Sequence, residues 1–149
     1  MILLDTNVIS ELMLVSPNHA VLAWLDQQLD EDLYLCVITK AEIEWGISLL
    51  PEGKRKLRLT KAAAEVLAAF KGRCLVYDCE ATPYYIAVAN CSRTSGRPMS
   101  VEDMLIAAIA MANNCILATR NVTDFDFLPD LELINPWAEI TEINEGRID

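Results

Sequence analysis

The sequence predicts an α/β fold of three layers, in which a central, mainly parallel sheet of about five strands is flanked by helices. Short apolar runs of strand length alternate with longer stretches of helical spacing, which is the pattern of such a sheet. The chain is also 53% hydrophobic, with a mean hydropathy of +0.25, which is too apolar for a disordered chain. Its 149 residues suffice for a core of its own, and we expect one domain over residues 1–149.

The predicted strands are apolar runs that end at turn-forming residues. The first run, Met-Ile-Leu-Leu, ends at Asp5 and is typical of a central strand buried on both faces. The last run is stopped by Asn135-Pro136, because proline cannot donate to a strand ladder. In chain order, the expected strands are residues 1–4, 33–38, 75–77, 115–118 and 131–134.

The predicted helices lie between these strands and are bounded by capping and breaking residues. A short helix follows Asp5, and Asn7 or Ser10 can cap it. Pro51 and Gly53 stop a later helix before a basic amphipathic one begins. The longer helices are expected over residues 18–29, 39–50, 54–70, 82–94 and 100–113.

The sequence shows no sign of a membrane or export segment. No apolar run is long enough to span a bilayer. The start lacks the basic region and the cleavage pattern of a signal peptide, so we expect a cytoplasmic protein. Five cysteines without a C-x-x-C pair indicate buried reduced thiols rather than a zinc or disulfide role; they are Cys36, Cys74, Cys79, Cys91 and Cys115.

The net charge of −10 argues against a nucleic-acid binder that works through a broad basic surface. It does not argue against one that holds phosphate through metal ions. One segment departs from this balance, and its cations are Lys54, Arg55, Lys56, Arg58 and Lys61. They form either a solvated helix face or a patch that contacts phosphate.

Four acidic residues carry the main functional signal. Asp5 ends the first strand, Glu42 and Asp103 lie at the starts of helices, and Asp124 follows the fourth strand. A parallel sheet brings its strand ends out at one edge, so these acids are expected to share a pocket. Clustered carboxylates repel one another unless a hard cation lies between them. The sequence therefore predicts a Mg²⁺ or Mn²⁺ site and phosphate chemistry.

Each of these acids also has a structural interpretation. Asp5 could cap the first helix, although Asn7 and Ser10 make it surplus to that need. Thr39-x-x-Glu42 has the form of a capping box, and Ser100-x-x-Asp103 resembles one.

The loop that contains Asn121 and Asp124 could owe its polar residues to turn chemistry alone. Asp78 and Glu80 follow a strand but are expected to serve an ordinary turn, and Glu11 could support the site from behind. His19, the one histidine, is expected at the surface.

Four segments, in this order and spacing, resemble PIN-domain ribonucleases: Leu3-Leu4-Asp5-Thr6-Asn7-Val8, Thr39-x-x-Glu42, Asp103-x-x-Ile106-Ala107-Ala108 and Ala118-Thr119-Arg120-Asn121. Within that family the chain looks like a VapC-type toxin of a type II toxin–antitoxin pair. Asn135-Pro136-Trp137 near the end is similar to the FitB-like branch. The resemblance covers nearly the whole chain.

The resemblance implies a PIN-like fold and a Mg²⁺- or Mn²⁺-dependent endoribonuclease whose RNA substrates include structured RNA such as tRNA. It implies a homodimer and a cognate antitoxin that inhibits the toxin in a higher-order complex. Asp5, Glu42 and Asp103 match the core acids of the family. Where a fourth acid is common, this chain has Asn121, so either Asn121 is a neutral ligand or Asp124 replaces the acid.

The competing interpretation is a non-catalytic PIN-like module that binds nucleic acid or protein. Such a module would be expected to lose core acids, and this chain keeps three of them. A phosphatase that uses an aspartate at the end of the first strand is a weaker alternative, because that chemistry needs a second aspartate where this chain has Asn7.

Overall fold

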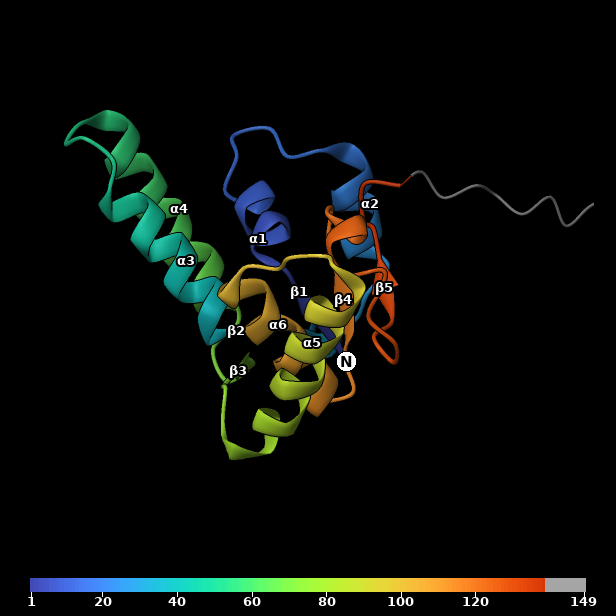
Figure 1. Ribbon diagram of the computed structural model, residues 1–149. Coiled ribbons are helices and arrows are strands. Elements are labelled where there is room, and N and C mark those ends of the chain that lie inside the picture. Colours follow the sequence, from blue (N-terminus) through green and yellow to red (C-terminus); the bar gives the residue numbers. More distant parts are fainter. Residues whose placement is uncertain (139–149) are drawn as a thin grey trace, which may run out of the picture.

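The computed structural model describes residues 1–138 and contains a five-stranded, fully parallel sheet in the order β3-β2-β1-β4-β5 (Figure 1). The central strand is therefore the first in the chain. The strands are β1 (Ile2–Leu4), β2 (Leu33–Cys36), β3 (Cys74–Leu75), β4 (Ile116–Ala118) and β5 (Leu133–Ile134). The predicted fold class is confirmed.

Six α-helices connect the strands and cover both faces of the sheet (Figure 1). The helices are α1 (Thr6–Leu12), α2 (His19–Asp26), α3 (Val37–Ser48), α4 (Lys54–Ala69), α5 (Thr82–Ser95) and α6 (Val101–Ala112). Three short 3-10 turns lie at Asp30–Asp32, Cys79–Ala81 and Val122–Asp124. The α3 and α4 helices form a hairpin that projects from one side of the molecule (Figure 1).

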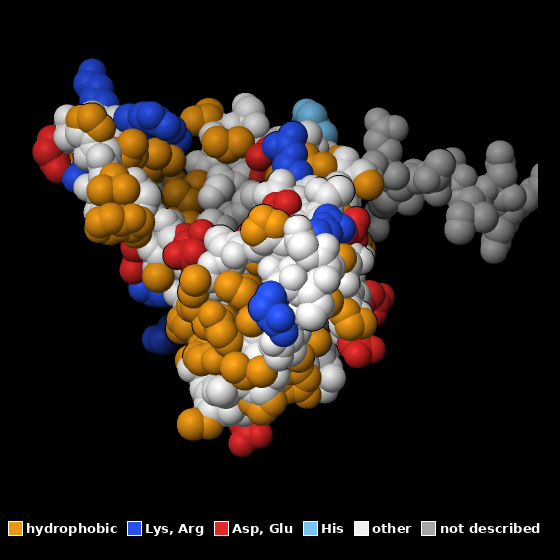
Figure 2. Space-filling model, viewed as in Figure 1, with side chains coloured by type: hydrophobic (Ala, Val, Ile, Leu, Met, Phe, Trp, Pro, Cys, Tyr) orange, Lys and Arg blue, Asp and Glu red, His pale blue; other side chains and the backbone are white. Residues whose placement is uncertain are grey.

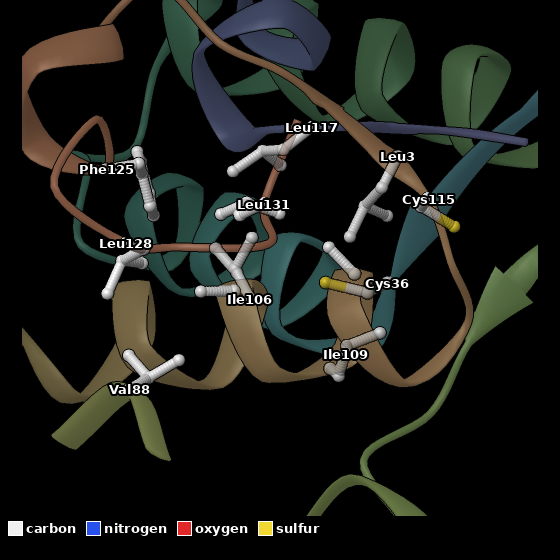
Figure 3. Packing of buried hydrophobic residues seen from close by; sticks show 12 residues of the cluster. Leu3, Cys36, Val88, Ile106, Ile109, Cys115, Leu117, Phe125, Leu128 and Leu131 are labelled. Atoms are coloured by element: carbon white, nitrogen blue, oxygen red, sulfur yellow. The ribbon is translucent and has the colours of Figure 1, made fainter. Parts of the chain in front are cut away.

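Side-chain alternation along the strands creates two cores, one on each face of the sheet. Leu3 and Leu117 face α5 and α6, where Ile106 and Ile109 complete a fully buried cluster (Figure 3). Their strand neighbours, among them Leu4, turn to the opposite face and pack against α1 to α4. Each fully buried leucine contributes roughly 2 kcal/mol through loss of contact with water. The sheet is thereby fixed between two helical layers.

The sheet order places a topological switch point between β1 and β4. The chain continues from β1 through α1 to one neighbour, β2, and returns only much later to the other neighbour, β4. In open parallel sheets, a crevice forms at such a point outside the carboxyl ends of the strands. Asp5 and Thr119 are the residues that directly follow β1 and β4.

The expected boundary between the second strand and the next helix is wrong. The β2 strand ends at Cys36, and α3 begins at Val37 rather than at Thr39. Cys36 is the cap residue and makes no side-chain capping bond. Thr39 lies within the first turn, so Thr39-x-x-Glu42 is not a capping box. The apolar Val37-Ile38 pair suits a strand equally well in sequence but lies in the helix.

The cysteine interpretation is correct only in part. All five cysteines are free, and Cys36 and Cys115 are buried, but Cys74 and Cys79 are exposed. Cys74 lies on β3, which is an edge strand and is paired on one side only. His19 is exposed, as expected. No helix within residues 1–138 combines the length and apolar character that a membrane crossing requires.

Candidate active site

A pocket of about 420 Å³ opens at the carboxyl ends of β1 and β4, at the switch point of the sheet. Three of the four acids singled out from the sequence line it, namely Asp5, Glu42 and Asp103. The remaining lining residues are Thr6, Asn7, Ser10, Glu11, Leu14, Arg120, Asn121 and Trp137. The pocket therefore joins side chains from both ends of the described chain.

Asp5 is the most buried of the acids, with 4% of its surface exposed. It is the N-cap of α1, where one carboxylate oxygen accepts the Thr6 backbone N–H at 2.8 Å. The other oxygen accepts the Thr119 hydroxyl at 2.7 Å and the Asn7 side-chain amide at 3.3 Å. From the sequence, Asp5 was expected to be surplus to helix capping, and this expectation is wrong. Asp5 caps α1 and also lines the pocket.

Glu42 reaches the pocket from the second turn of α3 and is half-buried. The Thr6 hydroxyl donates to its carboxylate at 2.8 Å. The hydroxyl oxygens of Thr6 and the fully buried Thr39 are 3.3 Å apart. Thr6 therefore links the α1 side of the pocket to α3 and orients the carboxylate of Glu42.

Asp103 lies in the first turn of α6, where a carboxylate is favoured by the partial positive charge of the helix start. Its backbone N–H donates to the hydroxyl of Ser100, the N-cap, at 3.0 Å. This is one half of the capping box expected from Ser100-x-x-Asp103. The Asp103 side chain turns to the pocket instead of completing that box.

The loop after β4 is tied to Asp5 through Thr119, which is fully buried. The Asn121 backbone N–H donates to the Thr119 hydroxyl at 3.1 Å, and the Asn7 amide lies 3.3 Å from the same oxygen. Asn121 lines the pocket, whereas Asp124 does not. Asp124 is exposed, in the turn Val122–Asp124, yet its charge still acts on Asp5 and Asp103.

Burial and mutual repulsion raise the pKa of all three pocket acids above their ordinary values. Burial is the main cause for Asp5, opposed by its hydrogen bonds from Thr119, Thr6 and Asn7. Burial also raises the pKa of Glu42 and of Asp103, and the charge of Asp5 adds to both. The other charges that add to these shifts are those of Asp103, Asp124 and Glu102.

The donor set fits a hydrated divalent ion. Carboxylate oxygens are the preferred ligands of Mg²⁺, which keeps several waters and needs only one or two protein carboxylates. Within residues 1–138, no three acidic, histidine or cysteine side chains converge closely enough to form a complete coordination set. Asp5 is engaged by Thr119 and Glu42 by Thr6, so waters would complete the coordination.

Comparison with known proteins identifies the family. The PIN domain family model matches residues 2–128, which include Asp5, Glu42, Asp103 and the loop after β4. This chain belongs to the PIN-domain family. The expected PIN-like fold is thereby confirmed.

Within the PIN-domain family the chain is similar to VapC and FitB proteins. It is 44% identical to VapC ribonuclease Y4jK of Sinorhizobium fredii over 92% of this chain and 98% of that protein. It is 41% identical to Toxin FitB of Neisseria gonorrhoeae over 93% of this chain and 100% of that protein. A structure of FitAB bound to a DNA fragment superposes with a TM-score of 0.84 at 39% identity, covering 93% and 97% of the two chains.

Several pocket residues lie in the segments that resemble the family, but from the sequence alone they were not assigned as metal ligands or catalytic groups. Thr6 and Thr119 orient Glu42 and Asp5, and Arg120 and Trp137 form part of the wall. Threonine next to an acid at a strand end is a weak signal, because the same pattern occurs in ordinary turns. Asp78, which follows a strand and was expected to serve an ordinary turn, caps a 3-10 turn. Glu11 accepts the backbone N–H of Asn18 at 2.7 Å, and the pocket wall includes it.

Proposed function

We propose that this protein is a divalent-metal-dependent endoribonuclease and the toxin of a type II toxin–antitoxin pair. The observation that carries the proposal is the convergence of Asp5, Glu42 and Asp103 on one pocket, where none of them forms a salt bridge within residues 1–138. Such a site favours divalent cations, and a divalent cation favours phosphate substrates. Similarity to proteins named VapC ribonuclease and Toxin FitB supports the choice of RNA and of a toxin role.

In the proposed mechanism, the acids and their threonine partners organise the scissile phosphate and the attacking water. A bound Mg²⁺ or Mn²⁺ would polarise a phosphoryl oxygen and lower the pKa of a coordinated water. Asp5 and Asp103 would supply carboxylate ligands to the ion. Glu42 has a raised pKa and would accept the proton of the attacking water. Asn121 would add a neutral oxygen ligand. Asp124 would contribute negative charge from outside the pocket wall.

The partners follow from the same similarity. One related structure contains FitAB with a DNA fragment, and another contains VapBC-1 of Haemophilus influenzae. We propose that this chain likewise binds a cognate antitoxin and forms a homodimer. A groove of about 300 Å³ leaves the acidic pocket at Leu14 and Glu42 and runs along the hairpin to Arg55 and Leu59. The hairpin also exposes Trp45, whose side chain is 66% accessible.

The decisive experiment incubates the purified protein with total RNA, with and without Mg²⁺, and sequences the cut ends. We expect discrete cuts that require the metal and disappear in Asp5→Asn and in Asp103→Asn. Asparagine is also a good N-cap, so Asp5→Asn should remain folded in a thermal melt. Full cleavage by either variant would contradict the proposed site. Metal-dependent RNA binding without any cleavage would favour the non-catalytic binding module.

A further inference from the structure

One wall of the acidic pocket consists of a cation and an aromatic ring in contact. The guanidinium carbon of Arg120 lies 5.2 Å from the ring centroid of Trp137, and both residues line the pocket. Arg120 follows β4, and Trp137 follows the neighbouring strand β5, so parallel pairing brings the two strand ends together. This wall stands beside Asp5 and Asp103 in the same pocket.

Both residues are held by contacts on their own side of the pocket. The Arg120 backbone N–H donates to the Asn7 side-chain oxygen at 3.2 Å, and the Asn7 amide in turn contacts Asp5. The Trp137 backbone N–H donates to the side-chain oxygen of Asn135 at 2.9 Å. The Trp137 ring also packs against the core cluster around α1 to α4. The wall is thus part of the same scaffold that positions the acids.

The Arg120 side chain differs from two other arginines that stack on aromatic rings. Arg73 stacks on Phe70 and donates to the Leu33 carbonyl, and Arg97 stacks on Phe127 and pairs with Asp126. Those two arginines join segments of the fold. Within residues 1–138, the Arg120 guanidinium forms no salt bridge and no hydrogen bond.

Arg120 forms no salt bridge with the pocket acids within the described part of the chain. The charges named as raising the pKa of Asp5, Glu42 and Asp103 belong to other acids. A guanidinium with free donors beside an aromatic surface suits a nucleotide, because it offers a charge for phosphate and a plane for the base. A base within a duplex is already stacked on its neighbours, so only an unpaired base gains from this wall.

We propose that Arg120 and Trp137 form a nucleotide subsite next to the cleavage centre. Arg120 binds the phosphate that neighbours the scissile one, and Trp137 stacks on an unpaired base of that nucleotide. The inference rests on the proposed ribonuclease function and narrows its substrate to single-stranded or loop RNA at the cut. Arg120 and Trp137 would then decide where the acids cut, without taking part in the bond breakage.

The test measures RNA binding in Ca²⁺, which replaces Mg²⁺ to hold RNA without turnover. The probes are a short fluorescein-labelled single-stranded RNA, the same RNA in a duplex, and an abasic strand of equal length. The variants are Trp137→Leu, Trp137→Phe and Arg120→Ala. Tyr84→Leu and Arg93→Ala are matched controls, because Tyr84 and Arg93 are exposed residues outside the pocket.

We expect Trp137→Leu to weaken single-strand binding about tenfold while Trp137→Phe stays near wild type. The abasic strand should bind Trp137→Leu and wild type equally. Arg120→Ala should weaken binding of both single strands and reduce the slope of log K against log salt by about 0.7. The controls should behave as wild type, and the duplex should bind weakly throughout.

Two results would overturn the subsite. One is wild-type affinity of Trp137→Leu for the single strand; the other is an equal loss on the abasic strand, which would indicate a packing defect. An unchanged salt slope in Arg120→Ala would show that Arg120 does not contact phosphate. The cleavage test and the binding test can fail independently. Loss of cleavage in Asp5→Asn would support the catalytic site even if the Arg120 and Trp137 variants bound RNA like wild type and thereby overturned the subsite. If wild type neither cuts nor binds RNA, both proposals fail together.

Discussion

The acidic pocket and the α3–α4 hairpin are neighbours on the surface, but they are held in different ways. In the pocket, contacts join residues far apart in sequence, such as Thr119 to Asp5 at 2.7 Å. On the hairpin, the salt bridges are local, such as Glu52 to Lys56 at 2.6 Å, one helical turn apart. Long-range contacts fix side chains to within the tolerance that catalysis needs, whereas exposed local pairs add little stability.

The exposed surface of the hairpin differs from that of the pocket as well. Leu49 and Leu57 of the hairpin are 64% and 71% accessible. Figure 2 shows hydrophobic side chains next to lysine and arginine side chains on the projecting part of the molecule. The pocket, by contrast, surrounds its acids with hydrogen-bond donors. The comparison supports the proposed division of roles, in which the pocket performs chemistry and the hairpin contacts partners. The predictions below test that division of roles, from the largest expected effect to the smallest.

The largest effect is expected for Glu42→Gln. Because Glu42 is not in a capping box and burial disfavours its charged form, the substitution should not lower the melting temperature. Loss of a carboxylate that takes a proton should lower RNA cleavage at least about 100-fold. Glu44→Gln on the same helix is the control, because Glu44 is exposed and pairs only with Lys40. Equal activity of the two variants in a Mg²⁺ cleavage assay would make Glu42 a structural residue.

The second-largest effect is expected for Thr119→Val. It removes the hydroxyl that donates to Asp5 but keeps the buried shape, so Asp5 loses one of its orienting hydrogen bonds. Loss of such a partner typically lowers metal affinity or activity by about 10- to 100-fold. Isothermal titration of Mn²⁺ and single-turnover cleavage would measure both quantities. Thr123→Val is the control, and a Thr119→Val enzyme with normal metal affinity and rate would show that Thr119 serves packing alone.

A smaller effect is expected in the loop after β4. Asn121→Asp places a charge in the pocket wall and should lower the Mg²⁺ concentration for half-maximal cleavage several-fold, about 1 kcal/mol. If Asp124 substitutes for the missing acid, Asp124→Asn should raise that concentration. The exposed position of Asp124 outside the pocket wall makes its effect the weaker of the two. Unchanged Mg²⁺ titration curves in both variants would show that neither Asn121 nor Asp124 contributes to metal binding.

On the hairpin, we expect the triple variant Lys54→Ala, Arg55→Ala and Arg58→Ala to weaken RNA binding modestly and flatten its salt dependence. Each lost phosphate contact lowers the slope for single-stranded RNA by about 0.7, and metal affinity should not change. If the hairpin serves only protein partners, RNA affinity stays constant. The mass measured by light scattering, alone or with antitoxin, then changes instead.

The smallest effect concerns pH and stability in the absence of metal. The pKa values of Asp5, Glu42 and Asp103 are raised in the fold, so the folded state holds these protons more tightly than the unfolded chain. Their stabilising contribution is complete below the ordinary values of 3.8 and 4.5 and is lost as the pH rises through the folded values.

Asp5→Asn removes one of these groups. Its free energy of unfolding relative to wild type should therefore increase with pH across this window and then level off. Denaturant titrations at several pH values, with and without Mg²⁺, would measure the trend. A decrease with pH in Asp5→Asn would mean that the fold stabilises the charged form of Asp5.

By itself, the sequence determined most of the fold and the identity of the acids. Short continuous apolar runs predict the strands and helical spacing predicts the helices, and polar residues mark where the strands end. The Val37-Ile38 pair was placed in the wrong element because a short apolar run fits a strand and a helix equally well. The capping-box interpretation of Glu42 failed for the same reason, since it depended on where α3 begins.

Only the tertiary structure decided which polar groups meet. Thr119 contacts Asp5 because β4 pairs beside β1 in the sheet order β3-β2-β1-β4-β5, a choice that local propensity does not encode. Trp137 reaches Arg120 because β5 pairs beside β4 in turn. Asp124 lies in the 3-10 turn Val122–Asp124 and is exposed outside the pocket wall, which the sequence did not reveal. Contacts between strand ends follow from strand order, and strand order is set by packing of the whole chain on both faces of the sheet.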